Sequence, residues 1–303
     1  MKTGFNKALI AKEGKVLLIG RPNVGKSTFV NTVIGQKVAI TSPKPQTTRF
    51  PIKAIYKEEC GAILFVDTPG LFGKTHDLLS RRINEQTYRV INDEIDVVIY
   101  MIDHTRKRDF EEAHVLGIVR KIHKPILLVV NKIEDQEKSF LPQYTFMEEE
   151  FKDHFHISAL KNLHIKPIID KIFELLPEKS TKKTTLLSEA DEERVYPIVN
   201  IDSKTFIAEL IREKIFLMMG EEIPYTTTVV VDEIKNRSDK LLFIKARMLT
   251  TTDRYKRMLI GAGGRKIKEV GSYARKEIAL ATGKKVYLDL TIHVDPHWQE
   301  IYY

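Results

Sequence analysis

The chain has 303 residues, of which 43% are hydrophobic and 30% charged, and its formal net charge is +8. This length favours two domains, and the composition excludes a disordered, collagen-like or disulfide-scaffold protein. A single cysteine cannot form an internal disulfide, and no apolar run approaches the roughly 20 residues that cross a bilayer. The N-terminal segment lacks the apolar core of a signal peptide. We therefore expect a cytoplasmic protein.

Short apolar runs alternate with helical patterns over residues 1–177. This alternation predicts an α/β domain with a mainly parallel sheet and helices on both faces. We expect strands at 16–20, 52–56, 62–67, 97–103, 126–131 and 155–158. We expect helices at 26–34, 80–93, 110–122, 142–151 and 165–175.

Residues 178–194 are polar and have no core-forming period, so we interpret them as a linker. Residues 195–303 then predict a smaller α+β domain in the order helix, strand, strand, helix, helix, strand. The expected ranges are 205–218, 226–233, 241–248, 254–260, 265–281 and 285–294.

The positive charge is concentrated in this last third of the chain. Twelve Lys or Arg residues but three acidic residues lie between positions 245 and 285, a surplus of +9 that exceeds the surplus of the whole chain. Such a surface favours a polyanionic partner. Charge alone, however, is better explained by an ordinary solvated face.

The segment from Gly20 to Ser27, after the first predicted strand, fits the phosphate-binding pattern G-x-x-x-x-G-K-S. Glycines let successive backbone N–H groups face a phosphate, and the start of the following helix adds its dipole. Lys26 is expected to reach the β- and γ-phosphates, and Ser27 to hold Mg²⁺. The nucleotide-binding residues predicted here are Gly20, Asn23, Val24, Gly25, Lys26, Ser27 and Thr28.

Two further motifs follow in the expected order. Asp67 ends a buried strand in the motif D-T-P-G, where its carboxylate can hold a metal-bound water and the Gly70 N–H can contact a γ-phosphate. Thr47 and Thr48 lie in the loop P-Q-T-T-R, and a threonine there can complete the magnesium shell when a γ-phosphate is present, as in a switch. Either motif alone would be an ordinary turn or cap. The predicted catalytic residues are Lys26, Thr48, Asp67 and Gly70, with Ser27 and Thr48 as metal ligands and Asp67 acting through water.

A base-binding site is predicted from the ends of the last two strands of the first domain. Asn131-Lys132-Ile133-Glu134 ends one strand, and Ser158-Ala159-Leu160 ends the other. The Glu134 carboxylate can accept hydrogen bonds from guanine N1–H and from the exocyclic amine, a pair of donors that adenine does not present. Lys132 can pack over the base, and the Ala159 N–H can donate to guanine O6.

Together these motifs resemble the small GTPases of the Era family. The segments G-R-P-N-V-G-K-S, P-Q-T-T-R, D-T-P-G and S-A-L match that family as they stand, and the resemblance covers nearly the whole chain. It implies a GTPase that uses Mg²⁺ with GTP or GDP. Turnover is expected to be slow, because Leu71 stands where Ras-like switches carry a water-orienting Gln. Asn23 suggests a K⁺ ion between the phosphates, and Glu134 replaces the usual Asp of the family.

The basic segment contains a G-x-x-G turn between two predicted helices, in which Gly261 and Gly264 would let a sugar-phosphate backbone approach closely. Alone, this pattern is usually a helix-capping turn. The charge and the element order favour a KH domain, which holds about four single-stranded nucleotides. The order resembles the type II KH domain of Era proteins. The predicted RNA-binding residues are Gly261, Ala262, Gly263, Gly264, Arg265, Lys266 and Lys268.

The resemblance also implies a role. We expect the chain to bind small-subunit rRNA near its 3′ end and to act, as a monomer, in assembly of the small (30S) ribosomal subunit and maturation of 16S rRNA. A peripheral contact with the inner face of the cell membrane is a further expectation. Two alternatives stay open: an RNA-binding module that holds nucleotide with little hydrolysis, and a P-loop ATPase with an RNA-binding appendage.

Overall fold

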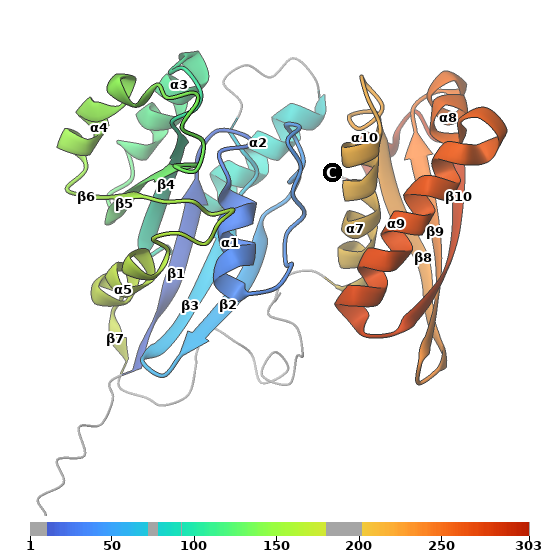
Figure 1. Ribbon diagram of the computed structural model, residues 1–303, viewed down its shortest axis with the longest axis horizontal. Coiled ribbons are helices and arrows are strands. Elements are labelled where there is room, and N and C mark those ends of the chain that lie inside the picture. Colours follow the sequence, from blue (N-terminus) through green and yellow to red (C-terminus); the bar gives the residue numbers. More distant parts are fainter. Residues whose placement is uncertain (1–10, 72–77, 92, 180–201, 303) are drawn as a thin grey trace, which may run out of the picture. The chain divides into compact units, whose positions relative to one another are not determined.

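The computed structural model describes residues 11–71, 78–91, 93–179 and 202–302 (Figure 1). The chain divides into two compact units. Among the described residues, unit 1 consists of 11–39, 50–71, 84–91 and 93–179. Unit 2 consists of 40–49, 78–83 and 202–302. Within these described ranges, no helix is long and apolar enough to cross a membrane.

Unit 1 is built on a seven-stranded sheet in the order β2-β3-β1-β4-β5-β6, with β7 paired to β1. Strands β1, β3, β4, β5 and β6 run parallel, whereas β2 pairs antiparallel with β3 and β7 with β1. The mainly parallel sheet predicted from the sequence is therefore confirmed. The strands are β1 (Ala11–Ile19), β2 (Ile52–Glu58), β3 (Gly61–Asp67), β4 (Val97–Asp103), β5 (Ile126–Asn131), β6 (Asp153–His156) and β7 (Glu178–Lys179).

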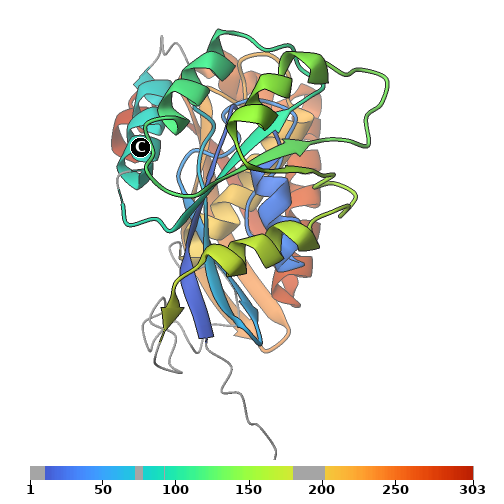
Figure 2. The same ribbon diagram turned by 90° about the vertical axis from the view of Figure 1, so that its left-hand side faces the viewer.

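Helices cover both faces of this sheet. The apolar sides of α3 and α4 pack against alternate sheet residues such as Leu17 and Tyr100. On the opposite face, Phe29 of α1 meets Phe65 of β3 edge to face at 6.0 Å, and Figure 1 shows α5 on the same side as α1. Figure 2 views the sheet from its β6 edge. The helices are α1 (Lys26–Ile34), α2 (Leu78–Ile91), α3 (Phe110–Val119), α4 (Thr145–Glu150) and α5 (Lys166–Leu175).

Several elements of unit 1 differ from the prediction. Strand β1 begins at residue 11 instead of 16, α2 and β6 each lie two residues earlier than expected, and α3 ends at residue 119 instead of 122. The helix expected over 142–151 is a 3₁₀ turn (Leu141–Gln143) followed by α4, because Tyr144 between them turns its fully buried side chain inward. The first two residues of the predicted linker form β7. Most of that linker, 180–194, lies outside the described residues, and the boundaries 1–177, 178–194 and 195–303 stay a prediction.

Unit 2 has the predicted order helix, strand, strand, helix, helix, strand. Its sheet runs β10-β9-β8, with β10 parallel and β8 antiparallel to β9. Strand β8 is longer than predicted, and it forms with β9 a hairpin whose tip is polar. The elements are α7 (Ser203–Met218), β8 (Thr227–Ser238), β9 (Leu241–Thr250), α8 (Asp253–Ile260), α9 (Arg265–Thr282), β10 (Lys285–Val294) and α10 (Trp298–Tyr302), the last of which was not predicted.

The core of unit 2 lies between one face of its sheet and the helices. Inward residues such as Ile244 and Val286 alternate along the strands and pack with α7 and α9, which run side by side in Figure 1. Ile40 belongs to this core although it lies far away in the sequence. The segment 40–49 is therefore an integral part of unit 2.

Candidate functional site

The predicted phosphate loop lies between β1 and α1 and passes close to neighbouring strands. Gly25 has φ 108°, and a Cβ there would lie 2.1 Å from Asn131 Nδ2. A Cβ on Gly20 would lie 2.4 Å from the Met101 carbonyl oxygen. Both positions therefore require glycine, and for Gly25 the positive φ adds a second reason.

The predicted phosphate-binding lysine is buried. Lys26 Nζ donates to the carbonyl oxygens of Gly20 at 3.1 Å and of Arg21 at 2.9 Å. Burial lowers the pKa of Lys26 to about 8, although the nearby carboxylate of Asp67 acts in the opposite direction. A buried ammonium that is costly to charge gains strongly from an anionic ligand, so this position fits a phosphate.

Ser27 and Asp67 form the predicted metal site. Ser27 Oγ donates to Asp67 Oδ2 at 2.6 Å. Asp67 is fully buried, and its Oδ1 has no hydrogen-bond partner in the described part of the chain. Burial raises the pKa of Asp67 to about 6 against the pull of Lys26 and Ser27. Hydroxyl and carboxylate oxygens are ligands that Mg²⁺ prefers, and a cation would compensate this buried carboxylate.

This raised pKa predicts a pH dependence of metal binding. A cation binds the ionised carboxylate, so protonation competes with it, and Mg²⁺ affinity should fall as pH drops through about 6, by up to about tenfold per unit. Mg²⁺ titrations of a fluorescent GDP complex between pH 7.5 and pH 5 measure the effect. The nucleotide also titrates in this range, so Asp67→Asn serves as the control, and an equally steep dependence in that variant would contradict the prediction.

The segment D-T-P-G lies directly against the phosphate loop. A Cβ on Gly70 would lie 2.4 Å from the Pro22 nitrogen, and the Leu71 N–H donates to the Gly20 carbonyl oxygen at 3.4 Å. Thr68 Oγ1 donates to the Leu18 carbonyl oxygen at 2.6 Å. The two motifs therefore meet at the carboxyl ends of β1 and β3, as predicted.

Asn131 connects the two parts of the predicted base site to the phosphate loop. Its Nδ2 donates to the Val24 carbonyl oxygen at 2.8 Å, and its Oδ1 accepts from the Ala159 N–H at 2.9 Å. The Ala159 N–H, predicted to reach guanine O6, is thus engaged within the protein. Leu160 carries the next main-chain N–H of this loop. The sequence could not show this, because Asn131 and Ala159 meet only in the folded sheet.

The lysine and glutamate of the base motif are positioned separately. Lys132 has φ 72°, and its Nζ lies 2.6 Å from Oδ2 of the fully buried Asp103. The Glu134 Oε2 atom is buried and has no hydrogen-bond partner among the described residues. An acceptor of this kind fits the two donors of guanine. Asp103 was missed from the sequence, although its place at the end of a parallel strand was a usable signal.

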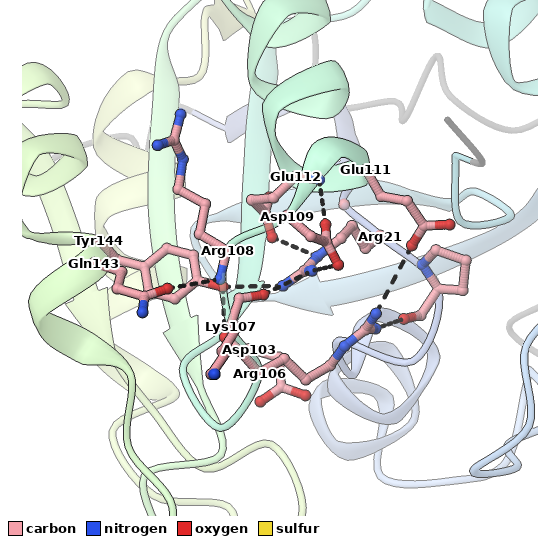
Figure 3. Close-up of polar contacts among 12 residues, drawn as sticks. Arg21, Asp103, Arg106, Lys107, Arg108, Asp109, Glu111, Glu112, Gln143 and Tyr144 are labelled. Carbon is pink, nitrogen blue, oxygen red and sulfur yellow. Dashed lines mark hydrogen bonds and ion pairs between the residues drawn. The ribbon is translucent and has the colours of Figure 1, made fainter. Parts of the chain in front are cut away.

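A buried ion pair fixes the start of the phosphate loop to α3, and the sequence analysis missed it (Figure 3). Arg21 Nε lies 2.6 Å from Glu112, and both side chains are fully buried. Arg21 also donates to Tyr144 Oη at 3.0 Å, and Tyr100 Oη donates to Glu112 at 2.5 Å. Burial raises the pKa of Glu112, with the Arg21 charge opposing. The sequence signal that could have revealed this pair was Glu112, an acidic residue on the apolar face of α3.

Removing one partner of this pair should destabilise unit 1 strongly. Arg21→Ala leaves Glu112 buried without its counter-ion, which is expected to lower the free energy of unfolding by about 3–5 kcal/mol. Urea denaturation measures the change. The exposed pair Arg120–Glu150, at 2.6 Å, provides the control, and Arg120→Ala should cost less than about 1 kcal/mol. Equal losses in the two variants would contradict the assignment.

The predicted switch threonines belong to unit 2. Thr47 Oγ1 donates to the Lys44 carbonyl oxygen at 2.7 Å, and the Thr47 carbonyl oxygen accepts from Arg212 of α7. The backbone of this loop is thus held by α7 within unit 2. The metal-binding role of Thr48 stays a prediction.

The G-x-x-G turn has the backbone geometry expected of it. Gly261 and Gly264 have φ values of 70° and 74°, and α9 begins at Arg265. A Cβ on Gly263 or Gly264 would meet no atom within 4 Å, so this turn faces open space. The predicted cations Arg265, Lys266 and Lys268 are exposed beside it.

A groove of about 280 Å³ runs beside this turn, between α9 and β10. Its lining combines apolar side chains with a polar one and with two positively charged ones. This combination suits a base in the groove and a phosphate at its edge. The sequence analysis missed most residues of this groove, although those on α9 recur every three to four positions in the sequence. The lining residues are Ile267, Lys268, Gly271, Ser272, Arg275, Leu288 and Leu290.

Comparison with known proteins identifies a family for each of the two parts of the chain. Residues 15–132 match the family described as 50S ribosome-binding GTPase, and residues 222–299 match the KH domain family. The chain is 35% identical to GTPase Era of Halothermothrix orenii over 95% of each chain. It is 37% identical to GTPase Era of Thermotoga maritima, over 95% of this chain and 94% of that one.

The chain belongs to the Era GTPase family. Among solved structures, it is similar to Era in complex with MgGDPNP and nucleotides 1506–1542 of 16S ribosomal RNA, with 31% identity, a TM-score of 0.85 and 95% of both chains covered. Aquifex aeolicus Era bound to GDP and aluminium fluoride gives 32% identity, a TM-score of 0.84 and the same coverage. As an Era GTPase the chain hydrolyses GTP, which decides against an ATPase.

Proposed function

We propose that this Era GTPase binds single-stranded rRNA in the groove between α9 and β10, and that its GTP cycle serves assembly of the small ribosomal subunit and maturation of 16S rRNA. The groove beside the G-x-x-G turn, whose lining combines apolar and positively charged side chains, carries the proposal. A similar protein has been solved with nucleotides 1506–1542 of 16S ribosomal RNA, which favours RNA near the 3′ end as the ligand.

In unit 1, the residues of the phosphate loop and of D-T-P-G would hold Mg²⁺ and the nucleotide. Bound Mg²⁺ would neutralise charge that develops on the phosphates. Lys26 would bind the β- and γ-phosphates, Ser27 would be a ligand of the metal, and Asp67 would act on the metal through water. The fully buried, apolar Leu71 cannot orient an attacking water, which fits slow turnover. We also propose K⁺ beside Asn23, and comparing turnover in K⁺ and in Na⁺ tests this.

Guanine selectivity should depend on Glu134. Removing its carboxylate would leave two guanine donors unpaired, so Glu134→Ala should reduce the preference for GTP over ATP by roughly hundredfold or more. Glu134→Asp should keep most of it. Competition binding of GTP and ATP measures the preference. Asp135→Ala, which removes the exposed neighbouring carboxylate, is the control, and an equal loss there would contradict the role of Glu134.

Three finer parts of the proposal concern the state of the protein in the cell. We propose a monomer, a cytoplasmic location and a peripheral contact with the inner face of the cell membrane. Sedimentation velocity tests the first, and flotation with vesicles containing anionic lipid tests the last.

A further inference from the structure

The sheet of unit 2 carries an aromatic pair on the face that its core does not use. Phe243 of β9 and Tyr287 of β10 are register partners, and their rings stack with centroids 5.7 Å apart and planes 15° from parallel. The Arg237 guanidinium lies 4.4 Å from the Phe243 ring centroid and 5.9 Å from that of Tyr287. Tyr287 is nevertheless 58% exposed. We call Arg237, Phe243 and Tyr287 the aromatic platform.

The platform and the groove lie on opposite faces of β10. Side chains alternate along a strand. Val286 and Leu288, which flank Tyr287, therefore face the other way. Val286 belongs to the core, and Leu288 lines the groove. In β9 the neighbours of Phe243 are likewise core residues. An RNA contact at the platform would therefore be separate from the groove.

The charge around the platform is positive. Two acidic residues of β8 are already paired: Glu233 lies 2.5 Å from Lys235, and Asp232 accepts from Arg247 at 2.7 Å. Within the described part of the chain, Arg237 has no ion-pair partner. Three further exposed cations lie on the strands or the turn of this sheet: Lys240, Lys245 and Lys285. Two further acids lie near them, Asp239 in the turn and Asp289, the register partner of Lys245. Together with Arg237, the cations outnumber these two acids.

We propose that the aromatic platform is a second RNA-binding surface, on which an unpaired base stacks against Tyr287 while the surrounding cations contact phosphates. The proposal rests on the RNA-binding function proposed above and adds a site to it. An exposed ring can stack on any base, and a guanidinium that uses its flat face for the rings still has N–H donors at its edge. Exposed lysines beside a ring suit the phosphates on either side of a stacked base.

Two RNAs separate the platform from the groove in binding experiments with the full chain. One is a segment of about four to six nucleotides, which is enough to fill the groove. The other has the sequence of nucleotides 1506–1542 of 16S rRNA. Tyr287→Ala should weaken binding of the long RNA by about tenfold, because one stacked base is lost, and should leave the short RNA unaffected. Tyr287→Phe keeps the stacking ring and should bind both RNAs as the wild type does.

Tyr273→Ala is the matched control. Tyr273 lies on α9, is 52% exposed and has the Lys276 ammonium 5.7 Å from its ring centroid, so the chemical change is the same at a site away from the platform. Its affinity for the long RNA should equal that of the wild type. GTP turnover and thermal midpoint should be unchanged in all three variants.

Wild-type affinity of Tyr287→Ala for the long RNA would overturn the proposal. If that variant also lost binding to purified small subunits, the platform would be a docking surface for a ribosomal protein instead. Equal losses for the short and long RNA would likewise overturn it, since they would place the effect in the groove. Failure of the short RNA to bind the wild type would count against the proposed groove and not against the platform.

Discussion

Lys26→Ala is expected to abolish GTP turnover and to weaken GTP binding by at least about hundredfold. The phosphates would lose their nearest cation in a buried site, where such a contact is worth several kcal/mol. Ser27→Ala should also stop turnover, because Ser27 is the predicted metal ligand and the hydrogen-bond donor to Asp67. Single-turnover hydrolysis and binding of a fluorescent GTP analogue measure both effects.

Loss of folding would not explain this result. Because the pKa of Lys26 is about 8 in the folded chain and near 10.5 when exposed, the unfolded chain binds more protons between these values. The contribution of Lys26 to stability therefore rises with pH over that window and is unfavourable below it. At pH 7, Lys26→Ala should unfold at no lower urea concentration than the wild type. The exposed Lys124→Ala is the control for turnover, and full hydrolysis by both site variants would contradict the phosphate-loop assignment.

The second large effect is expected at the G-x-x-G turn. Replacing Ala262 and Gly263 together with Asp would place two carboxylates against RNA phosphates and should weaken RNA binding by about hundredfold or more. Both positions are exposed, and Asp tolerates the φ of 59° at Gly263 better than most residues. Fluorescence anisotropy with single-stranded RNA measures the loss, and GTP turnover should persist.

The matched control keeps the geometry and removes the charge. Ala262→Asn with Gly263→Asn is nearly isosteric with the acidic pair, and Asn also tolerates positive φ. Wild-type affinity should fall as salt rises, because the cations beside the turn release counter-ions when they bind phosphate. Unchanged affinity of the acidic variant would refute the assignment of the groove. Equal losses in both variants would show a structural effect rather than an electrostatic one.

The bounds of several helices and strands could be predicted, because they depend on residues that are close together in the sequence. Helix α1 and the strands β4, β5 and β10 begin and end at the predicted residues, because apolar runs and glycine boundaries mark them. The phosphate loop, Asp67 and Asn131 could be placed together because parallel strands present their carboxyl ends at one edge of a sheet. The predicted nucleotide site followed from this placement, and the resemblance to the Era family followed from its motifs together with the order of elements in the second domain.

What could not be predicted depends on contacts between distant residues. Arg21 and Glu112 form a buried pair only after β1 and β4 are neighbours, so the arginine looked like an ordinary loop residue. The hydrogen bond between Asn131 and Ala159 likewise requires the folded sheet. The stacking of Phe243 on Tyr287 depends on strand register, which the spacing of apolar residues leaves undetermined across a parallel pair.

Unit 2 combines a segment that is synthesised early with one that is synthesised late, so its packing depends on the order of synthesis. Arg49 is fully buried, with the Phe216 and Trp298 rings 5.8 Å and 5.2 Å from its guanidinium carbon. At translation rates of about 5–20 residues per second, the arginine is made roughly 10–50 seconds before that tryptophan. Segment 40–49 thus leaves the ribosome well before Trp298 is made, and its packing in unit 2 is completed only after that later part of the chain has followed.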